Sequence, residues 1–157
     1  MISEVQTQSA RASGAETAVK AGRMATASRY KVILVDDYVE ILQRVEKLLA
    51  SKFDVLEKCS TAATALEAID RWDPDVVVLD ISMPPGLSGI ELSRAIRQKT
   101  SKPRFVYLTQ HEDAGLAHAV REDGGYAYVV KRLVATDLVR AIQAVMQGQS
   151  FVSEFVP

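Results

Sequence analysis

Five polar residues each come directly after a short apolar run, and their chemical types fit phosphoryl chemistry. These residues are Asp36, Asp37, Asp80, Thr109 and Lys131. Three carboxylates that share one site repel one another, so their ionisation requires a bound cation or raised pKa values. Oxygen ligands of this kind suit Mg²⁺ (or Mn²⁺), which keeps several waters and commonly contacts phosphoryl oxygens. A carboxylate can attack phosphorus when the developing charge is neutralised, and lysine and threonine supply a cation and a hydroxyl donor. The set therefore predicts acceptance of a phosphoryl group beside a divalent metal ion.

Short apolar runs predict strands over 31–35, 53–56, 75–79, 104–108 and 126–130, and all but the second end directly before these polar residues. Helical periodicity predicts helices near 38–49, 62–69, 90–96, 116–120 and 138–146. Ser60 or Thr61 is expected to cap the second helix, and Thr136 or Asp137 the last one. This alternation predicts a doubly wound α/β fold, with a parallel sheet covered by helices on both faces. Periodicity alone leaves the strand order open. Because ligands of such sheets bind beyond the carboxyl ends of the strands, the five polar residues are expected to share one crevice.

Length and composition favour one globular domain in a reducing compartment. The chain has 157 residues, a formal net charge of −1 and one cysteine, Cys59, for which a small core residue is the simplest interpretation. This charge gives no general basis for binding nucleic acid or an anionic membrane, so neither partner is expected. No apolar run approaches the roughly 18 residues of a membrane span, and the first residues lack the apolar core of a secretory signal. We therefore expect a cytoplasmic protein.

The composition changes sharply near Arg29. Residues 1–29 are rich in Ser, Thr, Ala and Gln, and such a segment buries too little apolar surface to offset the entropy of ordering it. We predict a disordered N-terminal extension over 1–29, a folded domain over 30–148, and a C-terminal tail or the start of a linker over 149–157. An inert leader is the favoured interpretation of the extension, and a partner-binding arm is the alternative.

The folded domain resembles the receiver domains of two-component response regulators and is similar to the single-domain chemotaxis regulator. The matching stretches are Val-Asp-Asp at 35–37, Leu-Asp-Ile-Ser-Met-Pro at 79–84, Leu-Thr at 108–109, and Gly-Tyr-Ala-Tyr-Val-Val-Lys at 125–131. They recur in order along residues 30–148, each at the end of an expected strand. The resemblance implies a flavodoxin-like (βα)5 fold with a five-stranded parallel sheet of order 2-1-3-4-5.

The resemblance also implies roles for individual residues. Asp80 would be the phosphoacceptor, Asp37 and Asp80 direct ligands of Mg²⁺, the Ser82 carbonyl a third ligand, and Asp36 a ligand acting mainly through a water. Thr109 and Lys131 would bind the phosphoryl group, and the rotamer of Tyr128 would follow Thr109 on activation. Ser82 and His111 occupy positions that tune the lifetime of the phosphoryl group in this family, and Gln110 would control access to the site.

Three features depart from the family pattern. The loop between Asp80 and Gly89 is one residue longer than usual, Gln110 stands where a small residue is usual, and Arg132 replaces the proline that usually follows the lysine. A cis bond costs about 3 kcal/mol without proline, so we expect a trans peptide before Arg132. Gln110 and Arg132 keep open an alternative, a receiver that binds partners independently of phosphate.

Other function classes fit less well. A phosphatase of the haloacid-dehalogenase type needs a second Asp two residues after the nucleophile, where this chain has Ser82. We therefore expect no enzymatic activity beyond self-phosphorylation from a phosphodonor and autodephosphorylation. A Rossmann nucleotide site needs a glycine-rich turn where the chain has Asp36 and Asp37.

The resemblance also implies partners. A sensor histidine kinase or phosphotransfer protein would supply phosphate, and a downstream protein or output domain would read the switch. Residues 151–155 look like the start of the linker in LuxR-type DNA-binding regulators, so the chain is expected to be either a stand-alone receiver or the receiver portion of such a protein. The partner or homodimer surface would be formed by the fourth helix, fifth strand and fifth helix. We expect it to include Leu116, Ala119, Tyr128, Lys131 and Leu138.

Overall fold

The structure, a computed structural model, describes residues 29–83, 87–110, 115, 118 and 127–154. Its strands are β1 (Lys31–Val35), β2 (Asp54–Cys59), β3 (Val76–Asp80), β4 (Arg104–Thr109), β5 (Ala127–Val130) and β6 (Phe151–Val152). Its helices are α2 (Val39–Leu49), α3 (Ala62–Trp72), α4 (Gly89–Lys99) and α6 (Val134–Met146), with a 3₁₀ turn η1 (Lys131–Leu133) before α6. None of the helices in these described ranges is long and apolar enough to cross a bilayer.

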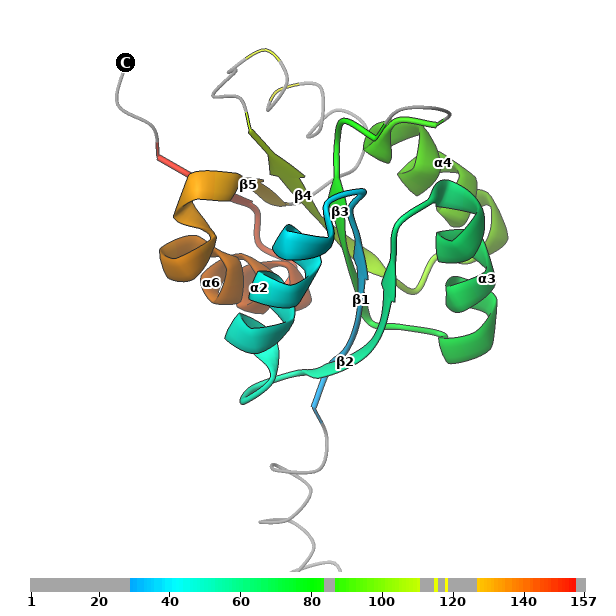
Figure 1. The fold of residues 1–157 in the computed structure, drawn as a ribbon, viewed down its shortest axis with the longest axis horizontal. Coiled ribbons are helices and arrows are strands. Elements are labelled where there is room, and N and C mark those ends of the chain that lie inside the picture. Colours follow the sequence, from blue (N-terminus) through cyan, green and yellow to red (C-terminus); the bar gives the residue numbers. More distant parts are fainter. Residues whose placement is uncertain (1–28, 84–86, 111–114, 116–117, 119–126, 155–157) are drawn as a thin grey trace, which may run out of the picture.

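The strands form one parallel sheet in the order β2-β1-β3-β4-β5-β6. Helices α2 and α6 cover one face, and α3 and α4 cover the other (Figure 1). Alternate residues of the central strands supply the two cores, as the period-two geometry of a strand requires. Every residue of β3 is buried, which explains why its sequence is a continuous apolar run. The predicted doubly wound fold and the order of the first five strands are confirmed.

The local predictions have mixed outcomes. Thr61, rather than Ser60, is the N-cap of α3, and its side chain accepts a hydrogen bond from the Thr64 N–H. The predicted capping of the last helix by Thr136 or Asp137 is wrong. Because η1 continues directly into α6, the helix begins at Val134 with Leu133 as its N-cap, and both predicted caps lie inside its first turn. The helix expected at 116–120 falls largely outside the described residues.

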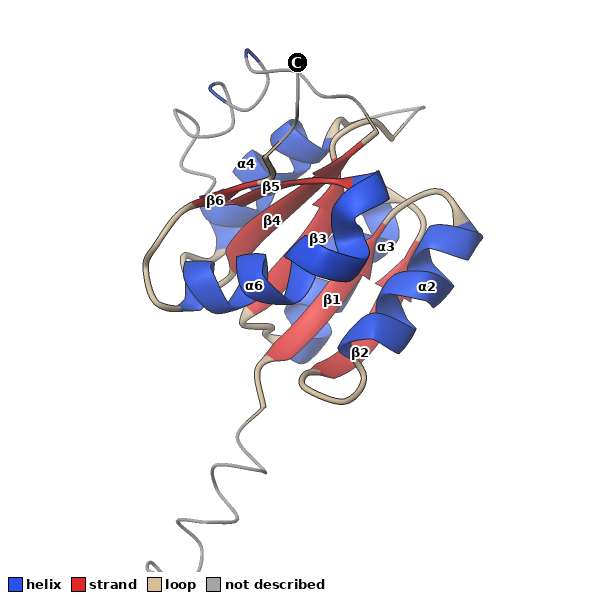
Figure 2. Cartoon of the chain, turned by 90° about the vertical axis from the view of Figure 1, so that its left-hand side faces the viewer, coloured by secondary structure: helices blue, strands red, loops and turns tan. Residues whose placement is uncertain are grey.

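The sixth strand was not predicted. Phe151 and Val152 pair in parallel with Ala127 and Tyr128, and this adds a short edge strand beyond β5 (Figure 2). A two-residue strand carries no recognisable alternation, so periodicity could not identify it.

Candidate functional site

Three carboxylates meet at the carboxyl ends of the adjacent strands β1 and β3. Asp36 and Asp37 follow β1, and Asp80 is the last residue of β3. One oxygen from each of these side chains lies within 4.8 Å of the other two. Asp36 and Asp80 are buried and Asp37 is half-buried. The three carboxylates predicted to share one site therefore lie together at the ends of neighbouring strands.

Backbone N–H groups hold two of the carboxylates. The Tyr38 N–H donates to Oδ1 of Asp36 at 2.9 Å, and the Ser82 N–H donates to Oδ1 of Asp80 at 3.2 Å. Each donor lies two residues after its acceptor, a local arrangement typical of Asp in turns. Asp36 is thereby held against the segment that leads to α2, and Asp80 against the loop that follows β3.

Lys131 places a positive charge beside two of the carboxylates. Its ammonium nitrogen lies 2.7 Å from Oδ2 of Asp36 and 3.3 Å from Oδ2 of Asp80. Lys131 follows β5 directly, so β3 and β5, which both flank β4, contribute groups to one site. The ring of Tyr38 lies beside the same ammonium, with its centroid 5.5 Å away. Our sequence interpretation missed this role of Tyr38; an aromatic residue immediately after the aspartate pair is the signal that could have suggested it.

Burial and charge shift the proton equilibrium of Asp80. Burial raises its pKa to about 6, and the neighbouring Asp36 carboxylate acts in the same direction. The Lys131 ammonium and the Ser82 N–H stabilise the charged form and oppose the rise. The net increase means that burial and the Asp36 carboxylate together outweigh the stabilisation by Lys131 and the Ser82 N–H.

A buried oxygen of Asp37 fits a metal site. Oδ1 of Asp37 is inaccessible to solvent and has no hydrogen-bond partner among the described residues. Oδ2 of Asp36 also lacks a hydrogen bond, but it has the ion pair with Lys131. An unpaired buried carboxylate oxygen is costly, and a divalent cation compensates it directly. The donor set is all oxygen and includes three carboxylates, so its chemistry fits Mg²⁺ or Mn²⁺.

The remaining predicted residues lie around this cluster. Thr109 ends β4 and is buried opposite Val130, while Tyr128 is buried opposite Tyr107. Ser82 and Gln110 are both exposed, the first in the loop after β3 and the second directly after Thr109. His111 lies outside the described residues.

Gly89 is a structural requirement that our sequence interpretation did not identify. Its N–H donates to the Ile81 carbonyl at 2.8 Å, and a Cβ at this position would overlap the carbonyl group of Asp80. The first residue of α4 therefore packs directly against the backbone of Asp80. The only signal in the sequence was the glycine at the end of the loop that follows Asp80.

Three of the residues predicted to lie on the partner surface are buried. Tyr128, Lys131 and Leu138 are 1%, 6% and 0% exposed, so they do not form part of a partner surface in this structure. The reason is that β5 has a strand on each side and α6 packs across it. Leu116 and Ala119 fall outside the described residues.

Comparisons with known proteins agree with this geometry. The family model for the response regulator receiver domain matches residues 32–143. The transcriptional regulatory protein DegU of Brevibacillus brevis is 26% identical over 127 residues, which is 80% of this chain and 53% of that protein. The oxygen regulatory protein NreC of Staphylococcus epidermidis is 30% identical over 125 residues, 78% of this chain and 57% of its own length. The chain thus spans a little over half the length of these relatives.

Solved structures give the same result. The isolated receiver domain of RcsB from Salmonella enterica serovar Typhimurium, determined with the phosphomimetic BeF₃⁻, aligns with a TM-score of 0.73 and 25% identity over 80% of this chain and 94% of that one. A LuxR-family two-component response regulator from Aurantimonas sp. SI85-9A1 aligns with the same TM-score and 30% identity over 78% of this chain and 89% of that one.

Proposed function

The chain belongs to the family of response-regulator receiver domains, and we propose that it is a signalling switch activated by phosphorylation of Asp80. The observation that carries the proposal is the ion pairing of one buried lysine with two carboxylates, next to a buried oxygen of Asp37 that has no hydrogen-bond partner in the described part of the chain. A purely structural cluster would pair its charges internally. Among the described residues this cluster keeps an excess of negative charge, as a site for a divalent metal ion requires.

Asp36, Asp37 and Asp80 would hold Mg²⁺, together with the Ser82 carbonyl. When bound, the ion supplies positive charge that neutralises the phosphoryl oxygens. The orphaned Oδ1 makes Asp37 the residue whose loss should weaken metal binding with least damage to the fold. We expect Asp37→Asn to reduce Mg²⁺ affinity at least about tenfold in calorimetric titrations. Asp70→Asn, which changes an exposed aspartate on α3, serves as the matched control.

In the proposed reaction, a carboxylate oxygen of Asp80 attacks the phosphorus of a phosphohistidine or a small acyl phosphate. The new bond is an acyl-phosphate P–O bond, and the bond between phosphorus and the donor's nitrogen or oxygen breaks, its electron pair leaving with the donor. The Lys131 ammonium already lies 3.3 Å from Oδ2 of Asp80. It would form an ion pair with an oxygen of the phosphoryl group once that group is attached. The Thr109 hydroxyl would donate to another phosphoryl oxygen.

We propose that the response travels through β4 and β5. Thr109 and Tyr128 lie on these paired strands, and Lys131 follows the second of them. Movement of Thr109 and Lys131 toward a phosphoryl group would alter the packing of the buried Tyr128 ring and, with it, the surface of the domain that β5 and α6 help to form. Ser82, Gln110 and His111 would set the lifetime of the phosphoryl group by controlling the approach of water.

The kinase and the output are inferred from the relatives. A histidine kinase or phosphotransfer protein would be the phosphodonor. DegU is a transcriptional regulatory protein and the Aurantimonas structure is a LuxR-family regulator, so a DNA-binding output on a longer chain is the proposed context. The alternative is a receiver that binds partners without phosphate; Gln110 and Arg132 favour it, whereas the intact acidic cluster favours phosphorylation.

The deciding experiment is incubation with acetyl phosphate and Mg²⁺, followed by intact mass spectrometry. We expect a phosphoryl adduct on the wild type and on Asp70→Asn, and none on Asp80→Asn. A phosphoryl adduct that still forms on Asp80→Asn would show that Asp80 is not the acceptor. A folded, metal-binding wild type without any adduct would support the phosphate-independent alternative.

A further inference from the structure

The edge of β5 is covered by the chain's own C-terminal segment, residues 151–154. Phe151 and Val152 pair with Ala127 and Tyr128, and the Ser153 N–H extends the ladder by donating to the Tyr128 carbonyl at 2.9 Å (Figure 2). Without this segment, β5 would be the edge strand of the sheet. We refer to residues 151–154 as the guard strand.

Ser153 anchors the guard strand through its side chain. Its Oγ accepts a hydrogen bond from the Val130 N–H at 3.1 Å and donates to Oδ2 of Asp137 at 2.7 Å. Ser153 is 2% exposed and Asp137 is 8% exposed. One hydroxyl therefore bonds both a backbone donor of β5 and one oxygen of a buried carboxylate of α6, whose other oxygen accepts from the Thr136 hydroxyl. The Val130 N–H would be costly to leave unpaired.

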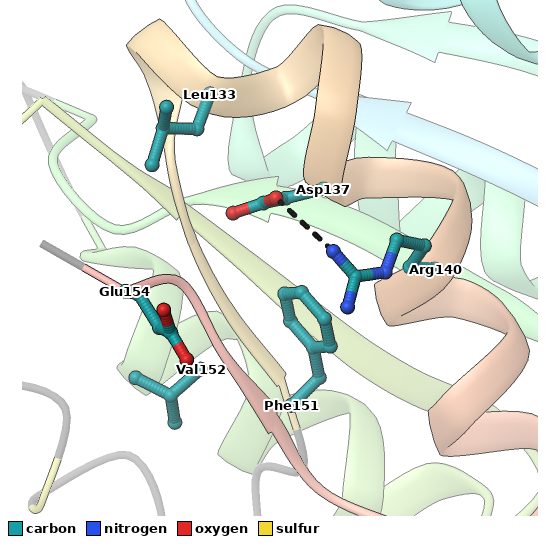
Figure 3. Close-up of a pocket in the computed structure, with 6 residues that line it drawn as sticks. All are labelled: Leu133, Asp137, Arg140, Phe151, Val152 and Glu154. Atoms are coloured by element: carbon teal, nitrogen blue, oxygen red, sulfur yellow. Dashed lines mark ion pairs between the residues drawn. The ribbon is translucent and has the colours of Figure 1, made fainter.

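The rest of the contact is sparse. Arg140 lies over the Phe151 ring at 5.4 Å from its centroid, and its guanidinium is 4.0 Å from Asp137 (Figure 3). A hollow of about 290 Å³ remains between α6 and the guard strand, lined also by Leu133, Val152 and Glu154. Phe151 and Val152 are only half-buried. The strand is held by its backbone pairing with β5, by the bonds of Ser153, and by Phe151 and Val152, which pack at the margins of the two cores. Because only two residues pair with β5, loss of the Ser153 bonds should ease its release.

Release would expose a strand edge suited to pairing with another chain. The four residues of β5, Ala-Tyr-Val-Val, carry no charge, proline or bulge of the kind that protects natural edges. The freed groups include the Tyr128 carbonyl and the Val130 N–H. Two such edges can pair about a twofold axis, each supplying the donors and acceptors that the other lacks. We propose that the guard strand is a releasable cover that keeps the β5 edge from pairing with the same edge of a second copy.

The test compares two serine substitutions and one truncation. Ser153→Ala removes the anchoring hydroxyl, whereas Ser150→Ala changes an exposed serine that directly precedes the guard strand. A chain ending at Gly148 lacks the guard strand entirely. Hydrogen exchange reports whether the edge opens, and sedimentation velocity over a range of concentrations reports self-association. Neither readout depends on phosphorylation.

We expect amide exchange at Val130 to be at least about tenfold faster in Ser153→Ala than in the wild type. The same variant and the truncated chain should form dimers at concentrations where the wild type and Ser150→Ala are less associated. Equal association of all four proteins, whatever its extent, would overturn the proposal, as would unchanged exchange at Val130 in Ser153→Ala. If the truncated chain does not fold, Ser153→Ala alone decides.

Discussion

The ammonium of Lys131 lies 2.7 Å from the Oδ2 of Asp36, and both side chains are almost completely buried. A buried ion pair of this kind is expensive to break, because removal of one partner leaves the other charge without compensation. Here the lysine also approaches Asp80, so one cation serves two carboxylates. The ion pair joins the residue that follows β5 to the residue that follows β1, and the stabilities of the Lys131 and Asp80 variants depend on this charge arrangement.

Lys131→Ala should lower the free energy of unfolding by about 3 kcal/mol in metal-free buffer at neutral pH, because two buried carboxylates lose their counter-charge. Urea denaturation measures this change. Lys99→Ala removes an exposed lysine that pairs with Asp70, and it should cost at most about 1 kcal/mol. Similar losses in the two variants would show that Lys131 contributes no more than a surface ion pair.

Asp80→Asn should stabilise the metal-free protein at pH 7.5. The native pKa of about 6 lies above the ordinary value of 3.8, so the native state holds the proton more tightly than the unfolded chain does. The contribution of Asp80 to stability is therefore largest below about pH 4 and is lost as the pH rises toward 6. We expect a gain of about 2 kcal/mol for Asp80→Asn relative to wild type at pH 7.5. The gain should shrink by pH 4.5, as measured by urea denaturation in EDTA. A difference that does not change with pH would contradict this account.

Gly89→Ala should destabilise the protein by about 3 kcal/mol, since its Cβ would overlap the Asp80 carbonyl and force α4 away from β3. Gly148→Ala is the control, because that glycine has φ 77° and open space around it, so only backbone strain of about 1 kcal/mol applies. Chemical denaturation of both variants measures which substitution lowers the free energy of unfolding more. A smaller cost at Gly89 than at Gly148 would mean that the start of α4 shifts freely.

Tyr38→Ala should shorten the lifetime of phosphorylated Asp80, because the aromatic ring lies beside the Lys131 ammonium at the mouth of the site. The half-exposed ring would limit the approach of water to the phosphoryl group, and its face attracts the cation. We expect dephosphorylation about fivefold faster in Tyr38→Ala, corresponding to about 1 kcal/mol. Tyr38→Phe keeps the ring and should retain the wild-type rate. Equal rates for the alanine and phenylalanine variants would assign the ring no protective role.

Acylation by an amine-reactive reagent tests the same contact without phosphorylation. Peptide mass spectrometry should detect faster labelling of Lys131 in Tyr38→Ala than in the wild type, because the ring no longer covers the amine. The labelling rate of the exposed Lys99 provides the internal reference.

The sequence by itself determined the alternation of strands and helices and the placement of Asp36, Asp37, Asp80, Thr109 and Lys131 at strand ends. Local patterns carry this information, because a buried strand must be apolar along its length and a polar residue must appear where it emerges. The matching motifs then indicated the family and, with it, the order of the first five strands.

Only the tertiary structure decided which side chains touch. The pairing of Lys131 with Asp36, the ring of Tyr38 beside it and the lack of room at Gly89 depend on distances between segments far apart in the chain. The burial of Leu138 and the docking of Ser153 against Asp137 depend on how α6 and the last strand close the sheet. Periodicity specifies which face of an element is apolar, but packing determines which neighbour covers it, so these contacts could not be predicted from the residues alone.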